Sequence, residues 1–220
     1  MQLSKETLAI FKNFGSINTN LTIKAGSHLT TVSTGKNIIA GATVTEDFPV
    51  EFGIYDINEF LGVMSLFNDP DLDFSEKFVT ISEGKNSVKY YSAASGVLTA
   101  VPNIKAFPSP DIEFEMSSSM LQQIQRVASV LKVADFSIIG DGDTMTLSVG
   151  DKSNPTGNSY SSEVGATDKT FRVNFKVENL RMMSGDYRVS IGSKKISRFQ
   201  STSQRLVYYV AIELDSTFGF

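Results

Sequence analysis

The 220-residue chain contains no cysteine and only one histidine, His28. The absence of cysteine excludes disulfide bonds, thiolate zinc sites and cysteine nucleophiles, and it fits a reducing compartment. A single histidine excludes a multi-histidine metal site, and His28 has no visible partner for the catalysis of a serine-histidine triad. No apolar run approaches the ~20 residues that span a bilayer, and the N-terminus has no basic leader with an apolar core. We therefore expect no metal site, no membrane span and no secretory signal.

The charge balance is mildly acidic, with a formal net charge of −4. That value argues against a protein that coats nucleic acid with its whole surface, because binding to the phosphate backbone needs clustered lysine and arginine. It does not exclude a local basic lining. A few cations gathered on one surface can favour phosphate while the total charge stays negative.

The hydrophobic pattern predicts four helices separated by strands, at residues 3–14, 57–67, 117–131 and 177–183. A proline-rich stretch interrupts regular structure between Ser95 and Asp111. In the first half, strands are expected at residues 17–24, 28–33, 37–44 and 48–55, with a turn at Glu46 and Asp47.

An internal duplication is suggested by the helical patterns of the two halves. A shift of 113 residues superposes Ser4 and the apolar positions of the first helix on Ser117 and those of the third. We predict two similar domains, at residues 1–100 and 112–220, joined by a connector at 101–111. Four helices cannot cover both faces of about fifteen strands, so the fold is predicted to be α+β, with the helices on one face of antiparallel sheets. Free sheet edges can then pair between subunits and build a closed ring.

Two of these helices carry cations opposite their apolar faces. Lys5 and Lys12 lie about two turns apart on the first helix, and Arg126 lies near the centre of the polar face of the third. No acid occurs between Met116 and Ala134, and Lys132 flanks the end of that helix. Such faces can be ordinary solvated surfaces, or they can face a polyanion.

The local motifs of the chain do not predict a catalytic or cofactor site. Asp141-Gly142-Asp143 lacks the downstream glutamate of a calcium loop and is typical of a hairpin turn. Gly150-Asp151-Lys152-Ser153 lacks the first glycine of a phosphate loop. No pair of carboxylates lies in an apolar surround that would separate their pKa values. We expect no enzyme activity and no cofactor.

Several strings of residues resemble one family. The most specific are Ile54-Tyr55-Asp56-Ile57-Asn58 and Phe60-Leu61-Gly62, because helix periodicity alone does not dictate them. Leu3-Ser4-Lys5, Lys24-Ala25-Gly26 and the C-terminal Asp215-Ser216-Thr217 agree with the same family. With these strings the chain resembles the sliding clamps of T-even-type bacteriophages, which are DNA polymerase processivity factors.

The resemblance implies a homotrimeric ring of two-domain subunits that surrounds double-stranded DNA without reading its sequence. It also implies loading by an ATP-driven clamp loader, tethering of the replicative DNA polymerase, support of late viral transcription, and a location in the cytoplasm of the infected bacterial host. It implies no catalysis by the clamp itself. On this basis the candidate DNA-facing residues are Lys5, Lys12, Arg126, Lys132, Lys176 and Arg181.

The resemblance also implies an apolar pocket near the connector and the C-terminus that accepts the hydrophobic tail of a partner. The residue candidates are Val101, Ile104, Phe107, Leu214, Phe218 and Phe220. Their alternative role is to close the cores of the domains. A different class of function remains open, a β-rich oligomeric structural protein of a virion, although that class does not explain where the lysines and arginines lie.

Overall fold

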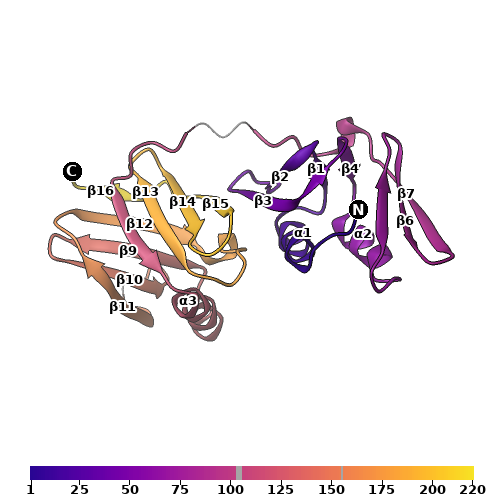
Figure 1. Ribbon diagram of the computed structural model, residues 1–220. Helices are drawn as coiled ribbons and strands as arrows, with labels where there is room; N and C mark the ends of the chain where they lie inside the picture. Colours follow the sequence, from indigo (N-terminus) through magenta and orange to yellow (C-terminus); the bar gives the residue numbers. More distant parts are fainter. Residues whose placement is uncertain (103–105, 155) are drawn as a thin grey trace. The chain divides into compact units, whose positions relative to one another are not determined.

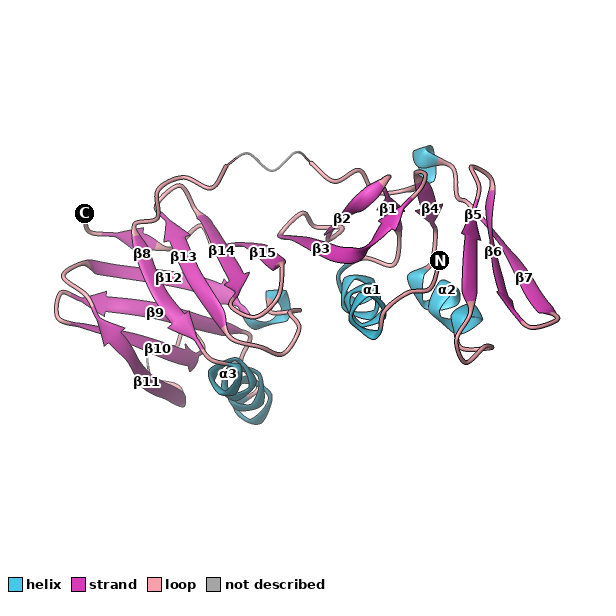
Figure 2. Cartoon of the chain, in the orientation of Figure 1, coloured by secondary structure: helices cyan, strands magenta, loops and turns pink. Residues whose placement is uncertain are grey.

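The computed structural model describes residues 1–102, 106–154 and 156–220, and the chain divides into two compact units. The first unit comprises Met1–Asn103 with Arg205–Val207, and the second comprises Ile104–Gln204 with Tyr208–Phe220. Strands predominate in both units, and the few helices lie against them (Figure 2). The predicted α+β class is therefore confirmed. The finer domain limits, with a connector at 101–111, remain a prediction.

The first unit contains two α-helices, one short 3-10 turn and seven strands. In chain order these are α1 (Lys5–Ile17), β1 (Leu21–Ile23), β2 (Gly26–Val32), β3 (Ile38–Phe48), β4 (Phe52–Ile54), α2 (Ile57–Met64), β5 (Asp71–Phe74), β6 (Phe78–Glu83), β7 (Asn86–Tyr91) and η1 (Ser95–Val97). The strands described in this unit pair antiparallel: β1 with β4, β2 with β3, β5 with β6, and β6 with β7.

Helix α1 forms because its two ends and its apolar face are both satisfied. The Ser4 side chain caps the N-terminus by accepting a hydrogen bond from the backbone N–H of Thr7 at 3.1 Å. Phe11 is fully buried and lies 6.0 Å from the ring of Phe60 on α2. Figure 1 shows α1 and α2 beside each other on one side of the strands β1 to β4. Their outer faces are left free of the core.

The second unit contains one α-helix, a second 3-10 turn and nine strands. They are β8 (Ile112–Met116), α3 (Ser118–Leu131), β9 (Asp135–Asp141), β10 (Thr144–Gly150), β11 (Ser159–Ala166), β12 (Thr170–Lys176), η2 (Val177–Asn179), β13 (Tyr187–Gly192), β14 (Ile196–Ser201), β15 (Leu206–Ala211) and β16 (Thr217–Phe218). One sheet has the order β11-β10-β9-β12-β16, and β15, β14, β13 and β8 lie side by side in another.

Helix α3 repeats the design of α1. Ser117 caps it by accepting from the backbone N–H of Met120, and Leu121, Ile124 and Ala128 are buried. Because apolar residues three and four apart share one face of a helix, these side chains point together into the core. In Figure 1 the helix lies along one face of the sheet, where it contacts β10.

The α-helix predicted at residues 177–183 is wrong. Only Val177–Asn179 forms a turn, the 3-10 helix η2. Beyond it, the carbonyl of Leu180 accepts a hydrogen bond from the side-chain amide of Gln125, and the N–H of Met183 donates to a tyrosine hydroxyl on β15. An α-helix that reached Met183 would use the N–H of this residue internally. Tertiary hydrogen bonds have replaced the helical ones, so three α-helices are present among the described residues.

Several predicted boundaries in the first unit are also wrong. The strand expected at 48–55 is limited to β4, and the helix expected to reach residue 67 ends at Met64. The turn expected at Glu46 and Asp47 lies inside β3, which continues to Phe48. Glu46 is an acid in a strand because its buried carboxylate bonds to the start of α1. The strand expected from Ile17 begins only at Leu21, because α1 runs three residues further than its apolar pattern predicted.

Candidate functional site

The outward face of α1 carries two of the predicted DNA-facing residues. Lys5 and Lys12 are both exposed, on the side opposite the buried Phe11 and Phe14. Glu6 is also exposed in the first turn. Seven residues correspond to almost two helical turns, so the two ammonium groups project from the same side of the helix.

The outward face of α3 is polar and free of acids. Arg126 is exposed among glutamine and serine side chains, and none of residues 118–131 is acidic. Lys132 is the C-cap residue and is exposed, with a left-handed backbone conformation at φ 55°. A cation at this end complements the negative end of the helix dipole. This surface can therefore offer positive charge and hydrogen-bond donors to a polyanion.

The two remaining cation candidates lie in a different setting. Lys176 is half-buried, and its Nζ lies 2.7 Å from a carboxylate oxygen of Asp135. Arg181 is exposed and donates through Nε to the carbonyl of Glu178 at 3.1 Å. The charge of Lys176 is thus compensated within the protein, unlike that of the exposed lysines on α1. Lys176 is the last residue of β12, and Arg181 lies on the segment where an α-helix had been predicted.

Helix α2 differs from α1 and α3 because it carries acids rather than cations. Asp56 caps it by accepting from the N–H of Asn58 at 2.8 Å. Glu59 lies near the hydroxyl of Tyr90, which donates to it at 3.4 Å. Burial, together with the Glu59 carboxylate, raises the pKa of Tyr90 to about 12. Both acids thus have roles within the first unit.

The predicted residues of the partner-tail pocket are only partly brought together. The rings of Phe218 and Phe220 lie 5.8 Å apart at the C-terminus, and β16 pairs Phe218 with Phe171 of β12. Phe107 instead lies 6.3 Å from the ring of Tyr209. Leu214 is 83% exposed and projects from the surface instead of lining a pocket.

The two other pocket candidates belong to the segment that leaves the first unit. Val101 is half-buried, and Ile104 lies outside the described residues. Lys169, which the sequence analysis did not identify, links the two parts of the predicted docking region. Its Nζ donates to the carbonyl of Asp111 and lies 4.7 Å from the centre of the Phe220 ring. A cation at this distance from an aromatic ring is attracted to the ring face.

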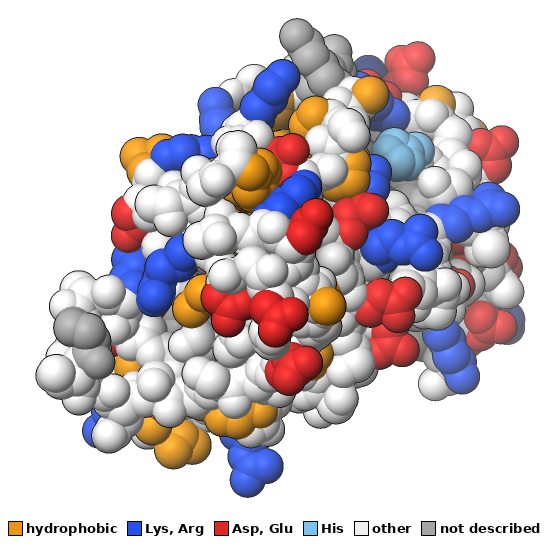
Figure 3. Space-filling model, turned by 90° about the vertical axis from the view of Figure 1, so that its left-hand side faces the viewer, with side chains coloured by type: hydrophobic (Ala, Val, Ile, Leu, Met, Phe, Trp, Pro, Cys, Tyr) orange, Lys and Arg blue, Asp and Glu red, His pale blue; other side chains and the backbone are white. Residues whose placement is uncertain are grey.

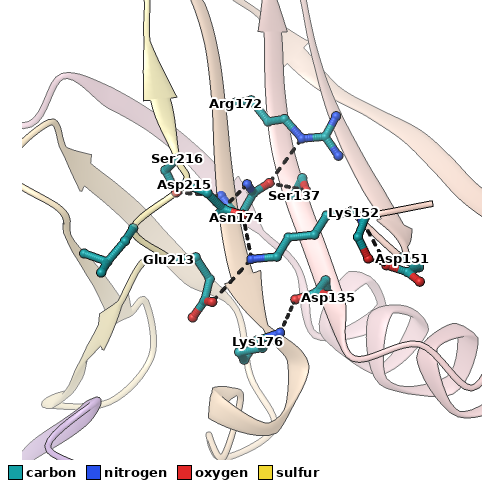
Figure 4. A network of polar contacts seen from close by, with 12 residues as sticks. Asp135, Ser137, Asp151, Lys152, Arg172, Asn174, Lys176, Glu213, Asp215 and Ser216 are labelled. Atoms are coloured by element: carbon teal, nitrogen blue, oxygen red, sulfur yellow. Dashed lines mark hydrogen bonds and ion pairs between the residues drawn. The ribbon is translucent and has the colours of Figure 1, made fainter. Parts of the chain in front are cut away.

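A polar network around Asn174 was also missed from the sequence (Figure 4). Asn174 is 3% exposed, and its side-chain carbonyl accepts from the hydroxyl of Ser137 at 2.7 Å. Its amide donates to Asp215 at 3.1 Å, and its backbone N–H donates to the hydroxyl of Ser216 at 3.0 Å. No sequence pattern marks an asparagine in a strand as such a centre, because its partners are distant in the chain.

Lys152 completes this network from the loop after β10. Its Nζ lies 3.3 Å from Glu213 and 2.8 Å from Asp215. Burial alone would lower the pKa of Lys152, but the hydrogen bonds to the two carboxylates outweigh burial and raise it. The hydrogen bonds from Lys152 and Asn174 in turn lower the pKa of Asp215. Lys152 and Asp215 are therefore both charged at neutral pH, and Asn174 is hydrogen-bonded to Asp215.

Charges of both signs intermingle over the face shown in Figure 3. Lysine and arginine side chains lie among aspartate and glutamate, and they do not form one large field of a single sign. Within the described part of the chain, no helix is long and apolar enough to cross a membrane. The same residues include no cluster of three or more histidine, aspartate or glutamate side chains placed to hold a metal ion.

Two family models match the chain in succession. Residues 4–97 match the model described as DNA polymerase processivity factor, and residues 113–214 match the model described as gp45 sliding clamp, C terminal. A sliding clamp of Vibrio phage KVP40 is 34% identical over 97% of this chain and 99% of its own length. The chain belongs to the sliding-clamp family. Sliding clamps of Escherichia phage RB69 and Enterobacteria phage T4 are each 28% identical over the full length of both chains.

Solved clamp structures share the fold at low sequence identity. The chain matches A. fulgidus PCNA, solved with the C-terminal region of FEN-1, with a TM-score of 0.70 at 12% identity over 96% of each chain. It matches the DNA polymerase III beta sliding clamp of Bartonella birtlesii with a TM-score of 0.70 at 13% identity, covering 97% of this chain and 64% of that one. This clamp chain is a DNA polymerase processivity factor, as its sequence predicted. The alternative of a virion structural protein is therefore set aside.

Proposed function

We propose that this clamp forms a homotrimeric ring around double-stranded DNA and tethers the replicative DNA polymerase to its template. The observation that carries the proposal is the outward face of α3, where Arg126 and Lys132 are exposed on a helix without a single acid. Lys5 and Lys12 give α1 a similar face. In a protein of net charge −4, cations arranged in this way favour phosphate locally.

The contact with DNA is proposed to be sequence-independent and weak. Exposed lysine and arginine side chains on helix surfaces suit phosphate contacts, which position a protein without reading bases. Lys176 and Arg181 are weaker candidates, because Lys176 is paired with Asp135 and Arg181 is bonded to the carbonyl of Glu178. Serine and glutamine side chains around Arg126 add hydrogen bonding without further charge. Such a surface lets a ring slide.

The trimer is proposed to close through edge strands of opposite charge. β7 ends the sheet β5-β6-β7 and presents the exposed Lys89, whereas β11 ends the sheet β11-β10-β9-β12-β16 and presents the exposed Glu163. A β7 edge paired with the β11 edge of another copy brings the two charges together, whereas like edges would repel. Such a head-to-tail contact repeats around a ring when its rotation closes.

The remaining partners and the setting follow from a closed ring and from the phage relatives. A closed ring cannot thread onto circular DNA without opening, so we propose that an ATP-driven clamp loader opens it. We also propose that the clamp supports late viral transcription and acts in the cytoplasm of the infected bacterial host, since the relatives named above are phage proteins. Its own role is topological and not catalytic.

The polymerase is proposed to dock at the C-terminal region. Leu214 and Phe220 are large apolar side chains that remain 83% and 51% exposed, and Phe218 lies beside Phe220. Phe107 with Val101 and Ile104 of the connecting segment are the other candidate contacts. Exposed apolar residues clustered on one segment are typical of sites for a hydrophobic tail.

The deciding experiment measures mass and topology together. Light scattering should give three times the chain mass of 24.0 kDa. Clamp loaded on nicked circular DNA should be retained through gel filtration and should be lost when the circle is linearised, because a ring slides off free ends. A monomer, or retention that ignores linearisation, would overturn the proposal.

A further inference from the structure

One large apolar side chain of the second unit is exposed on a turn whose backbone is held by hydrogen bonds. Leu214 is 83% exposed, and it lies in a turn closed by the hydrogen bond from the N–H of Ser216 to the carbonyl of Glu213 at 3.1 Å. The N–H of Glu213 donates to the backbone carbonyl of Asn174 at 2.8 Å, and the side chain of Asn174 binds Asp215. Both residues next to Leu214 are therefore tied to one buried strand residue.

Lys152 adds a second attachment to the same turn. Its ammonium group lies between the carboxylates on either side of Leu214, at 3.3 Å from Glu213 and 2.8 Å from Asp215 (Figure 4). The Lys152 side chain is only 19% exposed, so it loses less to solvent screening than a free surface lysine does. The carbonyl of Leu214 itself accepts from the ammonium group of Lys195. The backbone of the leucine is thereby restrained from three sides.

We propose that Lys152 is a positioning residue for polymerase docking, and that it acts by fixing the turn that presents Leu214. This inference rests on the proposed function, in which the C-terminal segment binds the polymerase. A preformed anchor loses less conformational entropy on binding than a mobile one. If these bonds served only to join β15 to β16, they would not need to hold both residues next to an exposed leucine. The two ion pairs of Lys152 lie on either side of Leu214, so its effect is expected to pass through that residue.

The test is a double-mutant cycle between Lys152 and Leu214. The measured quantity is the clamp concentration that gives half-maximal processive synthesis by the cognate polymerase on loaded primed circles. Lys152→Met is expected to raise this concentration about fivefold, the size that a networked ion pair supports, and Leu214→Ala to raise it roughly tenfold. In the Leu214→Ala background, Lys152→Met should have no additional effect. Lys152→Arg should stay within about twofold of the parent, because it keeps the charge.

The control is Lys194→Met, which removes an equal charge from an exposed lysine two residues after Gly192. It should leave the half-maximal concentration unchanged. The double variant Glu213→Gln with Asp215→Asn removes the other side of the ion pairs and should reproduce the loss seen with Lys152→Met. It keeps the test valid if Lys152→Met folds poorly. The inference would be refuted if Lys152→Met kept its full effect in the Leu214→Ala background. It would also be refuted if Lys152→Met had no effect in the parent clamp. Loss of retention on nicked circles by the unaltered clamp would instead refute the proposed function.

Discussion

The carboxylate of Glu46 accepts a hydrogen bond of 2.5 Å from the hydroxyl of Thr7. Its other oxygen accepts from the backbone N–H of Ser4, the N-cap of α1. Glu46 and Thr7 are both buried, at 8% and 1% exposure. One carboxylate of β3 thus holds the first turn of α1, where Lys5 lies. Glu46 therefore helps to fix the position of α1, and with it Lys5, on β3.

Replacing Glu46 with glutamine should destabilise the first unit by about 1–2 kcal/mol. The change removes the negative charge that strengthens the hydrogen bonds to Thr7 and Ser4, while the shape of the side chain is kept. The measurement is urea unfolding of the variant and the parent at pH 7. Glu51→Gln is the control, because Glu51 is exposed and should change stability little.

The same carboxylate makes stability depend on acid. Burial alone would raise the pKa of Glu46, but its hydrogen bonds with Ser4 and Thr7 outweigh burial and lower it below the ordinary 4.5. The folded state then binds fewer protons than the unfolded state near pH 4, so stability rises with pH there. The contribution is present above the ordinary pKa and is lost as pH falls through the folded one. In Glu46→Gln this part of the acid dependence should disappear, and equal slopes in both proteins would contradict the assignment.

Neutralising Lys5, Lys12 and Arg126 together with glutamine should shorten residence on nicked circular DNA without dissociating the trimer. Each lost phosphate contact should make the slope of log affinity against log salt shallower by about 0.9. The measurement is dissociation of loaded clamp at several salt concentrations. A control triple, with Lys24, Lys36 and Lys194 changed to glutamine, alters net charge equally at exposed positions outside the helices. Equal effects of the two triples would mean that only net charge matters.

Reversing the charge of one proposed edge should weaken the ring. Lys89→Glu would place a like charge opposite Glu163 of the next copy and should raise the dissociation constant of the trimer about fivefold or more. The measurement is sedimentation velocity across a range of concentrations. Lys89→Glu combined with Glu163→Lys restores opposite charges and should recover the trimer. A double variant that is weaker than either single variant would show that these edges do not meet.

Removing the ring of Phe220 should weaken polymerase stimulation and leave the oligomer intact. Phe220→Ala removes an exposed aromatic surface and its contact with Lys169, while β16 keeps its pairing with β12. Deleting residues 218–220 should weaken stimulation at least as much, since it also removes part of β16. The measurements are primer extension on loaded circles and light scattering. Unchanged stimulation by both variants would exclude the C-terminal rings from the docking site.

Two glycines should respond in opposite ways to alanine. A Cβ on Gly53 would lie 2.5 Å from the carbonyl oxygen of Ala93 and 2.7 Å from Cδ1 of Leu98, so Gly53→Ala should destabilise the first unit by about 3 kcal/mol. Gly62 lies in α2, and a Cβ added to it would project into open space, so Gly62→Ala should stabilise by about 1 kcal/mol. Thermal unfolding monitored by circular dichroism separates the two outcomes. A tolerated Gly53→Ala would mean that the segment around Ala93 is free to move.

Most of the candidate cation surface could be predicted from local patterns. The period of apolar residues in α1 and α3 requires Lys5, Lys12 and Arg126 to lie opposite the core, and Ser4 and Ser117 mark the helix starts. The segment after β12 could not be predicted in the same way. Its apolar spacing fits a helix, but side chains from other elements bond to its backbone.

By itself, the sequence determined the elements whose signals are local: the amphipathic helices with their caps, the α+β class, and the family, which its residue strings identify. Only the tertiary structure decided which polar residues meet. Asn174, Lys152 and Asp215 come from three separate segments, and Glu46 reaches Thr7 across 39 positions. Apolar periodicity records which face of an element is buried. A hydrogen bond or ion pair between distant residues leaves no such period, because it depends on where strand pairing and turns bring two side chains together.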